Sequence, residues 1–145
     1  MLCWIRRSKN SSDRWPAPRV VLAGFSRGAI ACNYIGLHDD QIAKLWCGFV
    51  PYSHYDGVRK WSFAKSDRAA AKVRLARLGE RPQFVLHEGD GASATEKYLR
   101  ESGIDIGKIE FMSTGFRNHN DAWILRPSKA REALRKWLRE VVAEK

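Results

Sequence analysis

Ser26 stands at the centre of the pentapeptide GFSRG, two residues from a glycine on either side. An apolar run typical of a buried strand, RVVLAG, leads into this pentapeptide, and a helical pattern follows it. In such a context G-x-S-x-G predicts a nucleophile elbow, a sharp turn that presents the serine hydroxyl at the end of a sheet. We expect Gly24 and Gly28 to avoid collisions that Cβ atoms would make there, and the N–H of Arg27 to face a developing oxyanion. The alternative interpretation is a tight glycine turn with a surface serine.

A serine nucleophile needs a base and an acid that orients the base, and both are expected at the carboxyl ends of later strands. His119 follows the fourth predicted strand and is the predicted base that takes the Ser26 proton. Asp90 follows the third predicted strand and is the predicted acid that fixes the His119 tautomer and stabilises the imidazolium. Three further carboxylates also remain candidates for the acid: Glu88, Asp56 and Asp121.

The other histidines are weaker candidates for the base. His54 follows the second predicted strand at the same edge of the sheet and is the second choice. His87 ends the third predicted strand, where we expect it to be packed, and His38 lies at the opposite edge, where we expect it at the surface. Four side chains are expected to line the pocket: Phe25, Tyr52, His54 and Tyr55.

The elements that must position these side chains alternate along the chain. Apolar runs predict strands over residues 19–24, 47–51, 83–87 and 108–113. Helical patterns cover 27–37 and 40–46, a stretch capped by Ser66 that runs to Leu78, a stretch with capping-box spacing from Ser93 to Glu96, and a stretch opened by Pro127 and Ser128. This order predicts an α/β fold, with a parallel sheet of about four strands flanked by helices in three layers.

The composition favours some classes of protein over others but does not identify a function. The 145 residues fit one domain, 44% of them are hydrophobic, and the formal net charge is +10. Residues 1–19, 65–81 and 126–145 each carry a net charge of +4, which we interpret as solvated helix faces and a basic chain start. Nucleic-acid binding is the less favoured interpretation, because no aromatic-interleaved basic motif or zinc-finger spacing is present.

Several classes of site lack support in the sequence. The sequence has no residues at the spacing of metal ligands and no glycine-rich loop of the kind that binds nucleotide cofactors. We therefore expect neither a metal nor a nucleotide cofactor. The three cysteines form no CxxC pair, and no apolar run is long enough to span a membrane. Because the chain start also lacks the apolar stretch of a signal peptide, we expect a cytoplasmic protein.

With these motifs in place, the chain resembles the α/β-hydrolase family. The elbow RVVLAGFSRGA is especially similar to the esterase, dienelactone hydrolase and prolyl-oligopeptidase-like branches, and the resemblance covers nearly all of residues 15–145. It implies Ser26 as nucleophile, His119 as base, Asp90 as acid and Arg27 as an oxyanion N–H donor. The implied activity is hydrolysis of an ester or related acyl bond of a small molecule through an acyl-enzyme.

The resemblance covers only the C-terminal half of that family's domain. Residues 1–17 resemble the lead-in helix and loop, and 18–145 resemble the core that follows. The loop that supplies the family's second oxyanion N–H has no counterpart in this sequence. We therefore expect a truncated domain whose first strand is an exposed edge, covered by a second copy or another partner chain. The alternative function is a catalytically impaired remnant that acts as a binding or assembly module.

Overall fold

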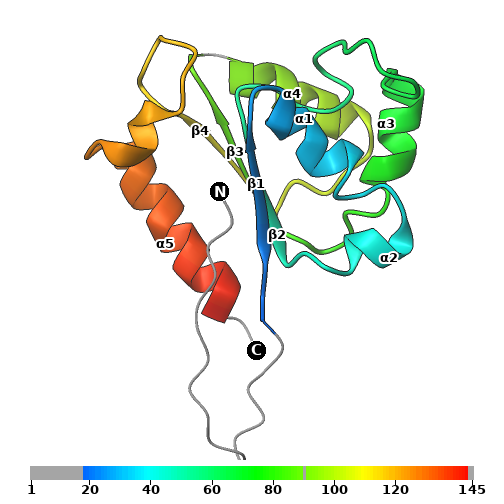
Figure 1. Cartoon of the computed structure of the whole chain (residues 1–145), viewed down its shortest axis with the longest axis horizontal. Coiled ribbons are helices and arrows are strands. Elements are labelled where there is room, and N and C mark those ends of the chain that lie inside the picture. Colours follow the sequence, from blue (N-terminus) through cyan, green and yellow to red (C-terminus); the bar gives the residue numbers. More distant parts are fainter. Residues whose placement is uncertain (1–17, 90, 144–145) are drawn as a thin grey trace, which may run out of the picture.

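A computed structural model describes residues 18–89 and 91–143, so the predicted lead-in over 1–17 lies outside the described residues. Four strands form one parallel sheet in the order β1-β2-β3-β4, which confirms the predicted fold class (Figure 1). The strand bounds are β1 Val21–Phe25, β2 Gly48–Tyr52, β3 Gln83–His87 and β4 Ile109–Ser113. Three of these start one or two residues later than predicted, and β3 matches the prediction.

Helices cover both faces of the sheet and make three layers. Their bounds are α1 Arg27–Tyr34, α2 Asp40–Ala43, α3 Arg68–Leu75, α4 Gly91–Glu101 and α5 Lys129–Ala143, with a 3₁₀ turn η1 at Ala122–Leu125. Figure 1 shows α5 alone on one side of the sheet and α1 to α4 on the other. No helix within 18–89 or 91–143 is long and apolar enough to cross a membrane.

Side-chain alternation along the central strands builds a separate core on each face. Phe49 and Val85 point to the core shared with α1 to α4, where Leu75 and Leu99 are buried. Their chain neighbours on β2 and β3 point the other way and pack against η1 and α5, most closely in the ring contact of Phe84 with Trp137. Burial on both faces is why these strands appear in the sequence as continuous apolar runs.

Two predicted helix starts are wrong, the first of them because a neighbouring residue makes the capping interaction. Asp67, and not Ser66, accepts a hydrogen bond from the N–H of Ala70, while the Ser66 hydroxyl donates to carbonyl groups of the preceding loop. The fourth helix begins at Gly91, so Ser93 already lies inside its first turn. A side chain at Gly91 would collide with the ring of His87. Because glycine has no side chain, the helix can start directly against the end of β3.

The predictions for the last and first helices have different outcomes. The last helix begins at Lys129, directly after the predicted opening at Pro127 and Ser128, and the Ser128 hydroxyl accepts a hydrogen bond from the N–H of Arg131. The first helix ends at Tyr34, three residues earlier than predicted. A Cβ at Gly36 would lie 2.1 Å from the carbonyl oxygen of Cys32, so the chain folds back closely on the helix end there.

β1 is an edge strand, hydrogen-bonded only to β2 among the described strands. The N–H of Ser26 donates to the Tyr52 carbonyl, and the Val20 carbonyl accepts from Cys47, so the even-numbered residues face β2. Backbone polar groups of consecutive residues in a strand point to opposite sides. Those of Val21, Ala23 and Phe25 therefore point away from β2. The carboxyl end of this edge strand leads directly into Ser26.

Candidate active site

Ser26 joins β1 to α1 in a backbone conformation that serine rarely adopts, with φ 55° and ψ −118°. Such a conformation costs on the order of 1–3 kcal/mol and persists only where the surroundings enforce it. A Cβ at Gly24 would lie 2.1 Å from the Gly28 carbonyl oxygen, so the turn requires a glycine there, as predicted. The steric prediction for Gly28 is wrong, because a Cβ at that position would meet nothing within 4 Å.

The start of α1 lies directly after Ser26. The Ser26 carbonyl accepts hydrogen bonds from the N–H groups of Ala29 and Ile30, which begins the helix. The N–H groups of Arg27 and Gly28 belong to the first turn, where a helix offers its donors no intrahelical partner. The helix dipole also favours negative charge at this end. An oxyanion beside Ser26 would thus lie at a helix N-terminus, and the role predicted for the Arg27 N–H stays a prediction.

His119 lies between the Ser26 hydroxyl and a carboxylate. Its Nε2 is 3.1 Å from Oγ of Ser26, and its Nδ1 is 2.8 Å from Oε1 of Glu88. Ser26 comes from the end of β1, Glu88 follows β3, and His119 lies in the loop after β4. When Nδ1 keeps its proton and donates it in a hydrogen bond to the carboxylate, Nε2 is unprotonated and can accept the hydroxyl proton. The three groups have the geometry of a nucleophile, a base and an orienting acid.

Glu88 holds the orienting position in the structure. Asp90, the first choice for the acid, lies outside the described residues. Asp56 is buried in a two-bond pair with Arg74, at 2.8 and 3.0 Å, and Asp121 starts η1, so neither of these carboxylates contacts His119. The position of Glu88 directly after β3 was the signal available in the sequence.

The surroundings of Glu88 favour its ionised form. Its side chain is only 6% exposed, and burial alone raises the pKa of the carboxyl. Hydrogen bonds from its own backbone, from His119 and from Ser53, together with the charge of His87, outweigh burial and bring the pKa below its usual value. The site therefore presents a carboxylate to the imidazole.

Ser53 is a site residue that the sequence analysis missed. Its hydroxyl lies 3.1 Å from Nδ1 of His119, on the same side of the ring as Glu88. The residue is 3% exposed and follows β2 directly, with a φ of 84°. Its place at the carboxyl end of a strand was the one available signal, and a serine in a loop is too common to stand out.

The predicted pocket residues divide into two groups. The Phe25 ring lies 4.7 Å from the His119 ring and 5.0 Å from that of Tyr52, and the His54 ring lies 5.5 Å from His119. These three are grouped around the imidazole. Tyr55 is instead 1% exposed and donates to the Gln83 side chain in the core, so its prediction as a lining residue was wrong. The side chain turns inward because that buried amide offers its hydroxyl a partner.

His54 is close to the site, with its ring half-buried beside that of His119. Burial lowers the pKa of His54, and the nearby charges of Arg59 and His119 lower it further. Its Nδ1 is buried with no hydrogen-bond partner among the described atoms. The neutral ring therefore acts as a wall of the site. His38 is exposed and pairs with Asp39, as expected for a surface residue.

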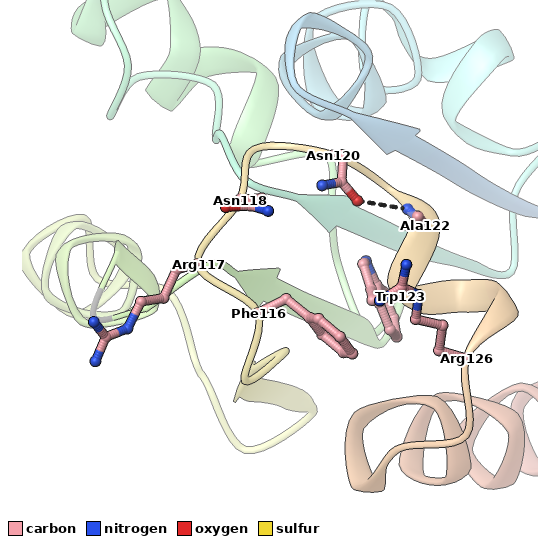
Figure 2. Close-up of a pocket in the computed structure, with 7 residues that line it drawn as sticks. All are labelled: Phe116, Arg117, Asn118, Asn120, Ala122, Trp123 and Arg126. Carbon is pink, nitrogen blue, oxygen red and sulfur yellow. Dashed lines mark hydrogen bonds between the residues drawn. The ribbon is translucent and has the colours of Figure 1, made fainter.

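The loop that carries His119 also encloses a hollow of about 190 Å³. Phe116, Asn118, Asn120 and Trp123 are among its walls, and the Asn120 side chain accepts from the N–H of Ala122 (Figure 2). The Tyr52 hydroxyl donates to the Asn120 carbonyl. These contacts tie the loop to β2 and η1 while leaving the His119 side chain 53% exposed. The base is thus held by its neighbours and remains open to solvent.

Neither a metal site among the described residues nor a similar known protein adds to this description of the site. No group of three or more His, Cys, Asp or Glu side chains able to hold a metal ion is present in the described part of the chain. No family model, no curated protein and no solved structure matches this chain.

Proposed function

We propose that the protein is a serine hydrolase that cleaves an ester or related acyl bond of a small molecule. The observation that carries the proposal is the position of His119, with Nε2 at 3.1 Å from Ser26 Oγ and Nδ1 at 2.8 Å from Glu88. The strained conformation of Ser26 supports it independently, because such conformations cluster at active sites.

The reaction follows from these contacts. Ser26 Oγ attacks the acyl carbon as its proton moves to Nε2 of His119, and the carbonyl oxygen becomes an oxyanion facing the Arg27 N–H. Glu88 stabilises the imidazolium, which gives its proton to the leaving oxygen as the carbon–oxygen bond breaks. A water molecule then attacks the acyl carbon as it gives a proton to the neutral His119, the bond from that carbon to Ser26 Oγ breaks, and His119 returns the proton to Oγ, which releases the carboxylic acid product and free Ser26. The acid in this scheme is Glu88 and not Asp90.

The resemblance to α/β-hydrolases is part of the same proposal. The elbow sequence and the chain order of serine, acid and histidine support membership of that family. Among the described residues the sheet has four strands, with β1 at its edge. A second copy or a partner chain pairing with β1 would cover this edge.

A second candidate function is a catalytically impaired remnant that acts as a binding or assembly module. The exposure of His119 favours it, because a water-filled site weakens every electrostatic interaction that catalysis would use.

Two free cysteines are compatible with a reducing compartment. Burial raises the pKa of the Cys32 thiol to about 12, and neither Cys32 nor Cys47 forms a disulfide. We propose a cytoplasmic location on this basis.

The test is turnover of short-chain and long-chain aryl esters by the wild type and by Ser26→Ala. The proposal expects turnover that saturates with ester and is lost in the variant. Turnover equal in both proteins, or absent from the folded wild type with every ester, would favour the impaired remnant.

A further inference from the structure

Ser53 combines three features that a serine in an ordinary loop lacks. It is 3% exposed, its φ of 84° lies in the left-handed region, and its hydroxyl reaches the Nδ1 side of His119 at 3.1 Å. The backbone is fixed there because its N–H donates to the Leu86 carbonyl at 2.8 Å, which extends the pairing of β2 with β3. The hydroxyl is therefore held at the site by the sheet.

The hydrogen-bonding capacity of the groups determines what this hydroxyl can do. Nδ1 carries one proton, and Glu88 is the closer, charged acceptor at 2.8 Å. The Ser53 hydroxyl also has one proton to donate, and the Glu88 carboxylate accepts it, because ionised carboxyl oxygens only accept. Glu88 then accepts hydrogen bonds from both Nδ1 of His119 and the Ser53 hydroxyl, and the Ser53 oxygen lies 3.1 Å from the same Nδ1.

We propose that Ser53 is a positioning residue, whose buried hydroxyl holds the Glu88 carboxylate and the Nδ1 edge of His119 in one arrangement so that Nε2 faces Ser26. The inference rests on the proposed function for its catalytic consequence, and it extends the site by a fourth residue from a separate strand. The strained backbone is explained by the same role, since a left-handed residue at this point directs the side chain into the site.

Among the described residues, charged and titratable groups lie around Glu88 on several elements. His119 lies on Oε1, and Nδ1 of His87 lies 3.3 Å from Oε2. Tyr52 and His54, from β2 and the loop after it, also interact electrostatically with Glu88. Ser53 is a neutral donor in this group, so removing its hydroxyl changes the hydrogen bonding and leaves every formal charge in place.

The direct test follows Glu88 by carboxyl ¹³C NMR titration in the wild type and in Ser53→Ala. Because a hydrogen bond to the ionised form lowers a pKa, its loss is expected to raise the pKa of Glu88. The Nδ1 proton resonance of His119 is expected to shift or broaden in the same variant. An unchanged Glu88 titration with an unchanged Nδ1 proton in folded Ser53→Ala would overturn the proposal.

A kinetic arm measures how fast a fluorophosphonate modifies Ser26. Both Ser53→Ala and Ser53→Gly are expected to slow the modification about tenfold, as for one hydrogen bond to a charged group. Glycine adopts a positive φ without strain, so we expect Ser53→Gly to fold even if Ser53→Ala is unstable. Lys65→Gly is the matched control, because Lys65 has a φ of 58° away from the site and its replacement is expected to leave the rate unchanged.

The two proposals fail in different ways. If the folded wild type is not modified at Ser26, the hydrolase proposal fails, while the NMR titration still decides the role of Ser53. If the wild type is modified and Ser53→Gly reacts at the wild-type rate, the positioning role fails and the hydrolase proposal stands.

Discussion

Glu88 and Asp90 lie two residues apart in the sequence after β3. Replacing each in turn tests which of the two carboxyl groups orients His119. Glu88 contacts Nδ1 of His119 at 2.8 Å, so Glu88→Gln would leave the imidazole in the wrong tautomer. We expect this variant to lose about 10⁴ in ester turnover, as when the orienting carboxylate of a triad becomes an amide. Turnover is measured at neutral pH.

Asp90→Asn is the matched control for Glu88→Gln. It makes the same chemical change two positions along the chain and is expected to leave turnover unchanged. A large loss in Asp90→Asn together with a small one in Glu88→Gln would assign the acid to Asp90.

The candidate site was predictable where the chemistry depends on local sequence. GFSRG identifies Ser26 because a sharp strand-to-helix turn needs a glycine at position 24, and His119 follows from its place after a strand. The choice between Glu88 and Asp90 depends on side-chain directions in a short loop. Ser53 meets His119 across 66 residues of chain, and no local pattern encodes such a contact.

At the scale of elements, the turn from β1 to α1 determines where Ser26 points. Gly24→Ala would put a Cβ 2.1 Å from the Gly28 carbonyl oxygen, so the backbone of the turn must move. We expect a loss of at least about 1–3 kcal/mol in the free energy of unfolding, as for other forced overpacking. Fluorophosphonate modification of Ser26 is expected to fall as well.

Gly28→Ala provides the control within the same turn. A Cβ there meets nothing within 4 Å, and alanine is favoured over glycine in a helix by about 0.5–1 kcal/mol. We expect this variant to be as stable as the wild type or more so in chemical denaturation. If Gly28→Ala were the more destabilised of the two, the described geometry of the turn would be incorrect.

The elements themselves differ in how far the sequence determines them. Apolar runs placed all four strands, and the two central ones, β2 and β3, are buried on both faces and so have no polar alternation to obscure them. Helix starts were harder, since adjacent polar residues compete for the same N–H groups. At Ser66 and Asp67 the carboxylate caps the helix, and the hydroxyl turns back to the preceding loop.

At the scale of the whole molecule, the edge of β1 that pairs with no other described strand is where we propose that a second copy binds. Backbone groups of Val21, Ala23 and Phe25 point away from β2, and such an edge is a template for pairing with another chain. We expect a mass twice that of one chain in light scattering at micromolar concentration.

Ala23→Pro tests the surface that forms this dimer. Proline removes a donor on the free edge while the hydrogen bonds from β1 to β2 remain. The variant is expected to be monomeric and folded. A strictly monomeric wild type, or an Ala23→Pro variant that remains dimeric, would show that the edge of β1 is not the interface.

The account as a whole depends on Ser26 being a nucleophile activated by His119. The most direct measurement is the intact mass of the wild type and of Ser26→Ala after exposure to a fluorophosphonate probe. We predict one covalent adduct on the wild type and none on the variant. A folded wild type that gains no adduct, or a Ser26→Ala variant that gains the same adduct, would contradict the account.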